Sequence, residues 1–140
     1  MGNRQTIQYC TTADGIRLAY SVIGKGSPII RTSHWLTHLE HDLDSPVWRH
    51  MVLGLSAHHT LVRYDPRGEG MSQRDGIEIS FDAWMADLDA VVAATGFDRF
   101  TLFGASQGAA TALTYALRCS RRRRTADPLW RLRDRSDALG

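Results

Sequence analysis

The residues with the clearest chemical signature form a glycine-bracketed serine, Gly-Ala-Ser-Gln-Gly, at positions 104–108. The run follows an apolar, strand-like segment and precedes a helix-like segment, Gln107–Leu117. A serine on so tight a strand-to-helix turn is held in a strained backbone conformation, and Gly104 and Gly108 leave the space that the turn needs. The turn points the hydroxyl out of the sheet, in front of a helix N-terminus. The pattern therefore indicates that Ser106 is a nucleophile for acyl carbons.

The groups that would activate this serine do not follow it in the sequence. All six histidines of the chain precede Ser106, whereas a serine hydrolase with this turn takes its acid and its base from later positions. The acids after Ser106 are Asp127, Asp134 and Asp137, in an arginine-rich stretch without a strand pattern. Loss of a triad partner costs a comparable hydrolase on the order of 10⁶ in turnover. Unless His34 substitutes as the base, we expect the 140-residue chain to be inactive or severely impaired.

The segments that must position the serine alternate between strand-like and helix-like patterns. They begin with a hairpin centred on Asp14-Gly15, a strong turn signal, and Ser80 and Gly96 have the residue types that cap a helix at its two ends. Such alternation predicts an α/β fold, with a mostly parallel sheet and helices on both faces. The expected segments are the strands Ile7–Cys10, Ile16–Val22, Ile29–Thr32, Leu61–Tyr64 and Phe100–Phe103, and the helices Pro46–Ala57, Phe81–Thr95 and Gln107–Leu117.

Three motifs together give the sequence a family resemblance. They are Ser-Pro-Val-Trp-Arg-His at residues 45–50, Leu-Val-Arg-Tyr-Asp-x-Arg-Gly-x-Gly-x-Ser at residues 61–72, and the serine turn itself. On these motifs, residues 7–117 resemble the N-terminal half of an α/β-hydrolase. They are most similar to a bacterial subgroup whose members occur alone or joined to adenylate cyclase or helix-turn-helix regulatory domains. The resemblance implies a partial α/β-hydrolase fold that is truncated after the helix following the nucleophile.

The resemblance also implies roles for individual residues. Ser106 matches the nucleophile that forms a covalent acyl-enzyme with an ester or related acyl substrate. The backbone N–H of Gln107 matches one donor of the oxyanion hole, and that of Trp35, in a loop reading Ser-His-Trp where relatives have His-Gly-x, matches the other. Each such donor typically lowers the barrier by about 2.7–4 kcal/mol. Because the family needs neither metal nor cofactor, we expect none, and we expect a small-molecule substrate.

A second glycine-rich motif is interpreted as structural. Asp65, Arg67, Gly68 and Gly70 could form a charged active-site cluster, but their spacing favours a turn. In that interpretation the glycines supply special backbone angles, and the two charged side chains tie the loop to its surroundings. The motif would then support the site without taking part in the reaction.

The remaining polar residues argue against metal binding and against export. His34, His38 and His41 have helix-like spacing, but the run does not match the H-E-x-x-H zinc motif. Two cysteines, Cys10 and Cys119, have no disulfide spacing pattern and no secretory segment precedes them, which favours a reducing cytoplasm. No apolar run approaches the roughly 18 residues of a membrane span, so we expect no membrane partner.

The charge distribution divides the chain into two parts. Residues 1–120 carry 10 Lys and Arg against 12 Asp and Glu, whereas residues 121–140 carry 7 Arg and 3 Asp. We therefore expect residues 1–118 to form the hydrolase part and residues 119–140 an Arg-rich tail, disordered or read out of frame. The alternatives are a rearranged short relative and a basic arm for nucleic acid or anionic lipid. The interspersed aspartates argue against specific nucleic-acid binding.

The expected position of the fifth strand has consequences for partners and function. In a complete fold of this kind the strand is central, so a chain that ends after the next helix exposes it as an apolar edge. Such an edge favours self-association or a partner chain that supplies the missing strands. The functional alternative to an impaired serine hydrolase is a non-catalytic fragment, or a regulatory or sensory hydrolase-like module.

Overall fold

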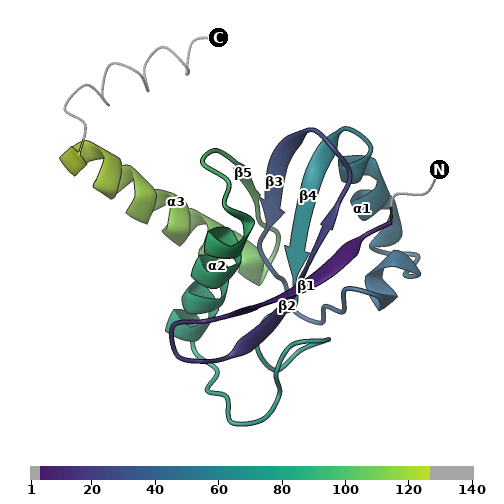
Figure 1. Cartoon of the computed structure of the whole chain (residues 1–140), viewed down its shortest axis with the longest axis horizontal. Coiled ribbons are helices and arrows are strands. Elements are labelled where there is room, and N and C mark those ends of the chain that lie inside the picture. The colour runs from purple at the N-terminus through teal and green to yellow at the C-terminus, as the bar shows by residue number, and fades with distance from the viewer. Residues whose placement is uncertain (1–3, 127–140) are drawn as a thin grey trace.

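A computed structural model of the chain describes residues 4–126 as one mixed sheet with helices on its two sides (Figure 1). The strand order is β1-β2-β4-β3-β5, and β2 runs opposite to the other four strands. The predicted α/β fold is therefore confirmed, with β2 as the antiparallel member. The elements are β1 (Thr6–Thr11), β2 (Arg17–Ile23), β3 (Ser27–Arg31), the 3-10 helix η1 (His41–Leu43), α1 (Arg49–Ser56), β4 (His59–Tyr64), α2 (Phe81–Thr95), β5 (Thr101–Phe103) and α3 (Gln107–Ala126).

Hydrophobic residues alternate along the strands, so that both faces of the sheet carry a core. On one face a core forms against α2, with the buried members Ile16, Leu18, Tyr20, Ile30, Val62, Tyr64, Leu88 and Val91. On the other face a smaller core forms against α1, with the buried members Ile23, Ile29, Val52 and Leu61. Successive side chains of a strand point to opposite faces, which is why Ile29 and Ile30 belong to different cores. Burying one such side chain fully contributes about 1.5–3 kcal/mol.

Local capping signals produce the boundaries that the sequence predicts. Gly15 has a φ of 85° in the hairpin between β1 and β2. The Ser80 hydroxyl accepts a hydrogen bond from the Ala83 N–H at 3.0 Å, and Gly96 ends α2 with a φ of 68°. A left-handed residue at this position lets the last helical turn satisfy its carbonyl groups. The predicted bounds of α2 are confirmed.

Helix α3 is longer than the sequence pattern suggests. It runs from Gln107 to Ala126, beyond the predicted end at Leu117 and into the segment assigned to the tail. Arginine and alanine are good helix formers, and Pro128 is the first strong helix breaker after Leu117, so the composition is compatible with this extension. The rest of the predicted tail, residues 127–140, lies outside the described residues.

Strand β5 forms one edge of the sheet. Strand β5 pairs with β3, and among residues 4–126 no other strand pairs with it. Self-association through this edge stays a prediction.

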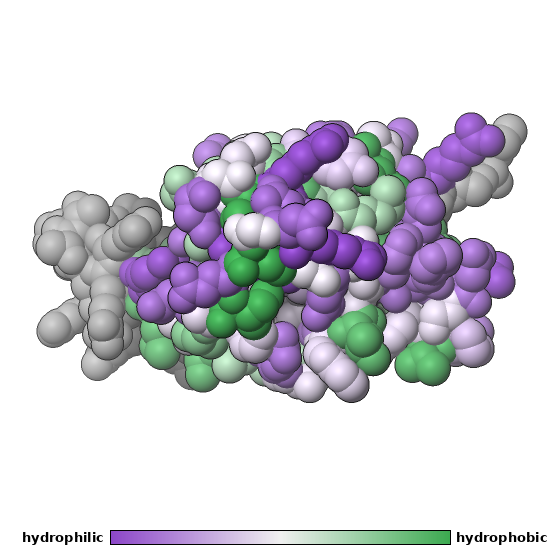
Figure 2. Space-filling model, turned by 90° about the horizontal axis from the view of Figure 1, so that it is seen from below, coloured by the Kyte–Doolittle hydropathy of each residue, from purple (hydrophilic) through white to green (hydrophobic). Residues whose placement is uncertain are grey.

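The face in Figure 2 is mostly hydrophilic, with separate hydrophobic patches. None of the described helices is long and apolar enough to cross a membrane. The large exposed apolar side chains are Tyr9, Trp35, Leu36, Val47, Leu53, Ile79, Phe81, Leu113 and Leu117.

Candidate active site

Ser106 is the last residue of the turn that joins β5 to α3, and its backbone is strained. Its φ of 54° lies in the left-handed region, which Leu36 alone shares among the non-glycine residues of the described chain. Such a conformation costs a non-glycine residue about 1–2 kcal/mol. Strand β5 ends at Phe103 and α3 begins at Gln107, so few residues are available to reverse the chain. Ser106 is exposed to solvent, as a nucleophile for a small molecule must be.

The glycines on either side of the serine allow the turn to pack closely. A Cβ atom on Gly104 would lie 2.7 Å from the Gly108 carbonyl oxygen and 2.9 Å from Ala112 Cβ. A Cβ atom on Gly108 would lie 2.8 Å from the Ser33 carbonyl oxygen. The Thr32 hydroxyl also donates a hydrogen bond to the Gly108 carbonyl at 2.6 Å. Gly104 therefore lets the turn pack against the first turns of α3, and Gly108 lets α3 approach the segment that follows β3.

That segment, residues 32–38, is here called the β3 loop, and it carries the second predicted oxyanion donor. Trp35 is 67% exposed, and the next residue, Leu36, has a φ of 58°. The Ser33 hydroxyl donates to the Tyr64 carbonyl at 2.9 Å, which fixes the start of the loop against the end of β4. The loop therefore combines a firmly held start with a strained residue beside Trp35.

Glu69 holds the far end of the β3 loop, a role that the sequence did not reveal. Its Oε2 atom accepts hydrogen bonds from the Thr37 N–H at 3.1 Å and from the Thr37 hydroxyl at 3.3 Å. Position 69 is a variable position of the Asp-x-Arg-Gly-x-Gly motif, and the two segments are 32 residues apart in the chain. No local pattern connects them, so a sequence signal was not available.

The two predicted oxyanion residues border the same pocket. This pocket has a volume of about 360 Å³, and both indole rings in its wall, Trp35 and Trp84, offer flat apolar surface. Ligand pockets are typically several hundred Å³ and largely apolar, with a few polar groups. Its lining residues are Trp35, Arg67, Gly68, Glu69, Arg74, Ile77, Ile79, Trp84 and Gln107.

His34, in the β3 loop, is buried, and its ring packs against Trp48, which precedes α1. It is 3% exposed, its ring centroid lies 4.1 Å from that of Trp48, and its Nδ1 lies 2.9 Å from the Trp35 carbonyl oxygen. Burial, and then the nearby Arg31, lower the pKa of the imidazole. No hydrogen bond joins His34 to Ser106 within the described part of the chain. Its role as a substitute base stays a prediction.

Arg67, which lines this pocket, joins three segments of the chain. Its Nε donates to Asp87 Oδ1 at 2.9 Å, and its Nη1 donates to Asp14 Oδ2 at 2.6 Å. The hydrogen bonds with Arg67 hold the pKa of Asp14 well below its usual range. Burial raises the pKa of Asp87, an effect that its hydrogen bonds from Arg67 oppose. These contacts agree with the structural interpretation of this motif.

The neighbouring turn depends on Asp65 and two glycines. Asp65 Oδ2 accepts hydrogen bonds from the Met71 N–H at 2.9 Å and from the Leu39 N–H at 3.3 Å. Gly70 has a φ of 51°, and a Cβ atom there would lie 2.1 Å from Asp65 Oδ2. Gly68 has a φ of 83°. The turn therefore positions Glu69, which lies between the two glycines, against the β3 loop.

The histidines at helix-like spacing form a turn. The rings of His38 and His41 lie with centroids 4.0 Å apart, and His38 Nδ1 accepts from the backbone N–H groups of Glu40 at 3.2 Å and His41 at 3.3 Å. Within residues 4–126 no three His, Cys, Asp or Glu side chains gather in a way that could hold a metal ion. His38 instead stabilises the backbone at the entry to η1.

Comparison with known proteins identifies the family. The model of the alpha/beta hydrolase fold family matches residues 38–122, which include both the Asp-x-Arg-Gly motif and the serine turn. The chain belongs to the alpha/beta hydrolase fold family. It is 31% identical over 112 residues to the 2-hydroxy-6-oxo-2,4-heptadienoate hydrolase of Pseudomonas putida. That match covers 76% of this chain and 38% of the relative, so the chain spans well under half of the relative's length.

Solved structures of this family resemble the described fold. The haloalkane dehalogenase DatA of Agrobacterium tumefaciens matches with a TM-score of 0.68 and 26% identity, over 86% of this chain and 38% of the dehalogenase. An alpha/beta hydrolase of Sphaerobacter thermophilus matches with a TM-score of 0.63 and 27% identity, over 76% of this chain and 38% of the other. The sheet and helices described above therefore correspond to a part of the complete fold.

Proposed function

We propose that this protein is a hydrolase of ester or related acyl bonds and that Ser106 is its nucleophile. The observation that carries the proposal is the strained φ of 54° at an exposed serine between a strand and a helix. A protein retains such strain where the surrounding structure enforces it, and these positions cluster at active sites. Membership of a hydrolase family agrees with this chemistry.

The proposed reaction proceeds through a covalent intermediate. Ser106 Oγ forms a bond to the acyl carbon as a base takes the hydroxyl proton, and the carbonyl π electrons move onto the oxygen. The backbone N–H groups of Gln107 and Trp35 are the proposed donors to this oxyanion, and both residues border one pocket. Collapse of the intermediate breaks the bond to the leaving alcohol, which takes up the proton. Water then attacks the acyl-enzyme in the same way and releases the acid.

We propose a small molecule with an apolar acyl portion as the substrate class. The pocket that borders Gln107 presents the rings of Trp35 and Trp84 and the side chains of Ile77 and Ile79. An apolar group that leaves water for such a wall gains about 25 cal/mol per Å² of buried surface. The relative from Pseudomonas putida is named for a small-molecule substrate, 2-hydroxy-6-oxo-2,4-heptadienoate, which agrees with a small substrate here.

A second proposal concerns the rate of this chain by itself. Within the described residues no hydrogen bond joins a histidine or a carboxylate to Ser106. We therefore propose that the 140-residue chain turns over slowly or serves as a non-catalytic, regulatory module. Without the base, oxyanion and binding effects remain, and these give a small residual acceleration.

Hydrolysis of short-chain nitrophenyl esters tests both proposals. Ser106→Ala removes the nucleophile, and Thr114→Ala, an exposed hydroxyl two turns further along α3, is the matched control. Ser106-dependent catalysis predicts that the first variant loses the enzyme-dependent rate and that the second keeps it. An equal rate above buffer in all three proteins contradicts the nucleophile. No rate above buffer in any of them supports the non-catalytic proposal.

A further inference from the structure

A buried arginine near the end of β3 lacks a counter-charge. Arg31 is 3% exposed, and its Nε and Nη2 atoms have no hydrogen-bond partner within the described part of the chain. Burial lowers the pKa of Arg31 to about 10, so the guanidinium is still charged at neutral pH. An ion that loses its water without gaining partners is strongly destabilising, and such groups in a native protein call for a physical explanation.

The nearest carboxylate is already engaged by a second buried arginine. Arg63, also 3% exposed, pairs with Asp42 at 3.4 Å. Its Nη2 donates to Gln5 Oε1 at 2.7 Å and to the Leu39 carbonyl at 3.1 Å, while its Nε has no partner among the described residues. Arg31 contacts the Trp48 ring at 5.0 Å, which offers a cation–π attraction but no negative charge.

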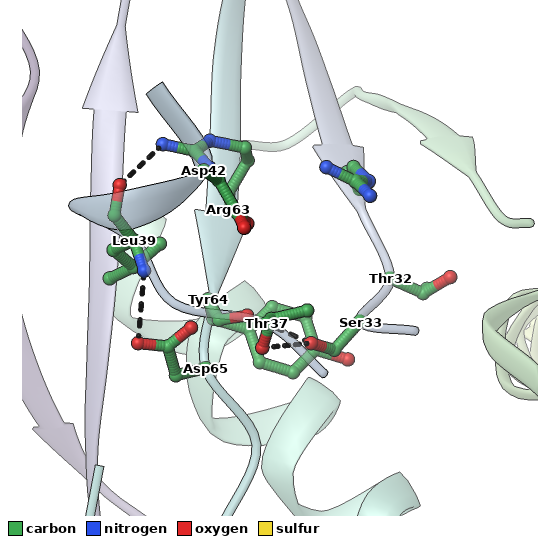
Figure 3. Close-up of a pocket in the computed structure, with 9 residues that line it drawn as sticks. Thr32, Ser33, Thr37, Leu39, Asp42, Arg63, Tyr64 and Asp65 are labelled. Carbon is green, nitrogen blue, oxygen red and sulfur yellow. Dashed lines mark hydrogen bonds and ion pairs between the residues drawn. The ribbon is translucent and has the colours of Figure 1, made fainter. Parts of the chain in front are cut away.

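Both arginines border one small, partly open cavity, shown in Figure 3. Its volume is about 10 Å³, which is about the size of one water molecule. The figure shows Arg63 and Asp65 on either side of Leu39, whose carbonyl and N–H they bind. The lining residues are Arg31, Thr32, Ser33, Thr37, Leu39, Asp42, Arg63, Tyr64 and Asp65.

The other titratable groups near the cavity do not neutralise Arg31. Burial lowers the pKa of His34, which favours its neutral form. Burial raises the pKa of Asp65, and its carboxyl group accepts hydrogen bonds from the Met71 and Leu39 N–H groups. Arg31 therefore has no ion-pair partner among the described residues.

We propose that this cavity binds one monatomic, monovalent anion of the halide class. Three nitrogen atoms without a hydrogen-bond partner, two on Arg31 and one on Arg63, belong to side chains in its wall, and an anion accepts from several donors at once. The small volume of the cavity favours a monatomic ion over sulfate, phosphate and organic acids. The bound ion neutralises Arg31 directly below the β3 loop and stabilises the folded chain. This site is separate from Ser106 and does not depend on the proposed hydrolysis.

The dependence of stability on chloride tests this proposal. Urea unfolding is measured at fixed ionic strength while sodium chloride replaces sodium gluconate, whose anion is too large for the cavity. An ion that binds the folded state alone raises the unfolding midpoint progressively with its concentration. Arg31→Met removes the charge at similar length and abolishes the rise. Arg17→Met, which removes an exposed arginine stacked on Tyr9, is the matched control and keeps it.

A second measurement covers the case in which Arg31→Met does not fold. Crystals of the unaltered chain grown in sodium bromide are analysed by anomalous scattering, and the proposal predicts a bromide peak between the guanidinium groups of Arg31 and Arg63. A cavity that contains water without an anomalous peak overturns it. The proposal is also overturned if the midpoint is the same in chloride and gluconate, or if Arg31→Met responds to chloride as strongly as the unaltered protein.

Discussion

Replacing Arg67 by methionine is predicted to destabilise the fold strongly, by about 3–5 kcal/mol, because it leaves a buried carboxylate without its partner. Asp87 is fully buried, and it accepts from Arg67 Nε at 2.9 Å and from the Arg67 backbone N–H at 3.0 Å. The variant keeps the second bond and loses the first, together with the opposite charge. Methionine fills much of the same volume, so loss of packing is a minor part of the effect.

Asp14, the other partner of Arg67, provides the contrast. The Asp14 side chain is 52% exposed, so solvent screens its ion pair with Arg67. Pairs of this kind contribute about 0–1 kcal/mol, and we expect Asp14→Asn to fall in that range. A second contrast is the double variant Arg67→Met with Asp87→Leu, which removes the buried charge as well as its partner. It is expected to recover most of the lost stability, since an apolar pair can replace a buried ion pair at little cost.

The pH dependence of the Arg67→Met variant gives an independent check. Burial raises the pKa of Asp87, and loss of Arg67 removes the hydrogen bonds and charge that oppose this rise. A carboxyl whose pKa is higher in the folded state than in the unfolded state binds more protons when folded. Its contribution to stability is therefore present at low pH and is lost as the pH rises through the folded-state pKa. The penalty of Arg67→Met is expected to shrink on acidification.

Urea unfolding followed by tryptophan fluorescence measures all of these differences. With slopes of about 1–3 kcal/mol/M for small proteins, a loss of 3–5 kcal/mol lowers the midpoint by more than about 1 M. Equal midpoints for Arg67→Met and Asp14→Asn would refute the reasoning, because burial of Asp87 would then make no difference. So would a double variant that is less stable than Arg67→Met alone.

Three further predictions concern backbone strain and capping, and each is measured by urea unfolding. Gly70→Ala is expected to lower the free energy of unfolding more than Gly76→Ala does, by at least about 1 kcal/mol. Both residues have a positive φ, but the added Cβ meets Asp65 at 2.1 Å at position 70 and open space at position 76. Equal losses of stability in the two variants would contradict the clash. Ser106→Gly is expected to raise the free energy of unfolding, by up to about 1 kcal/mol, because glycine adopts a φ of 54° without strain. Any Ser106-dependent esterase activity is lost in the same variant. An unchanged or lower stability would show that the turn is not strained. Ser80→Ala is expected to cost about 1 kcal/mol, since it removes the hydroxyl that accepts from the first turn of α2, and Ser80→Asp, which keeps an acceptor, serves as its control.

The sequence predicted those parts of the fold that depend on neighbouring residues. The apolar run that begins at Ile29 predicted the strand β3, and the cap residues Ser80 and Gly96 gave the bounds of α2. The extension of α3 to Ala126 was not predicted, because the change to an arginine-rich composition was interpreted as the end of the fold, whereas arginine is a good helix former.

The sequence did not predict contacts between segments that lie far apart in the chain. Glu69 binds Thr37 across 32 residues, and no periodicity or motif relates the two positions. His34 was considered as a base for Ser106 because its loop was expected to flank the serine turn. The packing of its ring on Trp48 could not be predicted from the order of residues in the chain. Arg31 directly follows two isoleucines, a position at which a side chain is often buried. Only the structure shows that Asp42 pairs with Arg63 and leaves Arg31 without a counter-charge.

The sequence by itself determined the serine turn, the helix caps and the alternating strands, because turn geometry, capping and side-chain direction are set within a few residues by steric and hydrogen-bond rules. The tertiary structure alone decided the sheet order, with β4 between β2 and β3, and the burial of two arginines below the β3 loop. The sheet order depends on which apolar faces meet when the chain collapses. The burial of the arginines depends on the loss of water around side chains that are far apart in the sequence. Neither can be determined from a short segment of the chain.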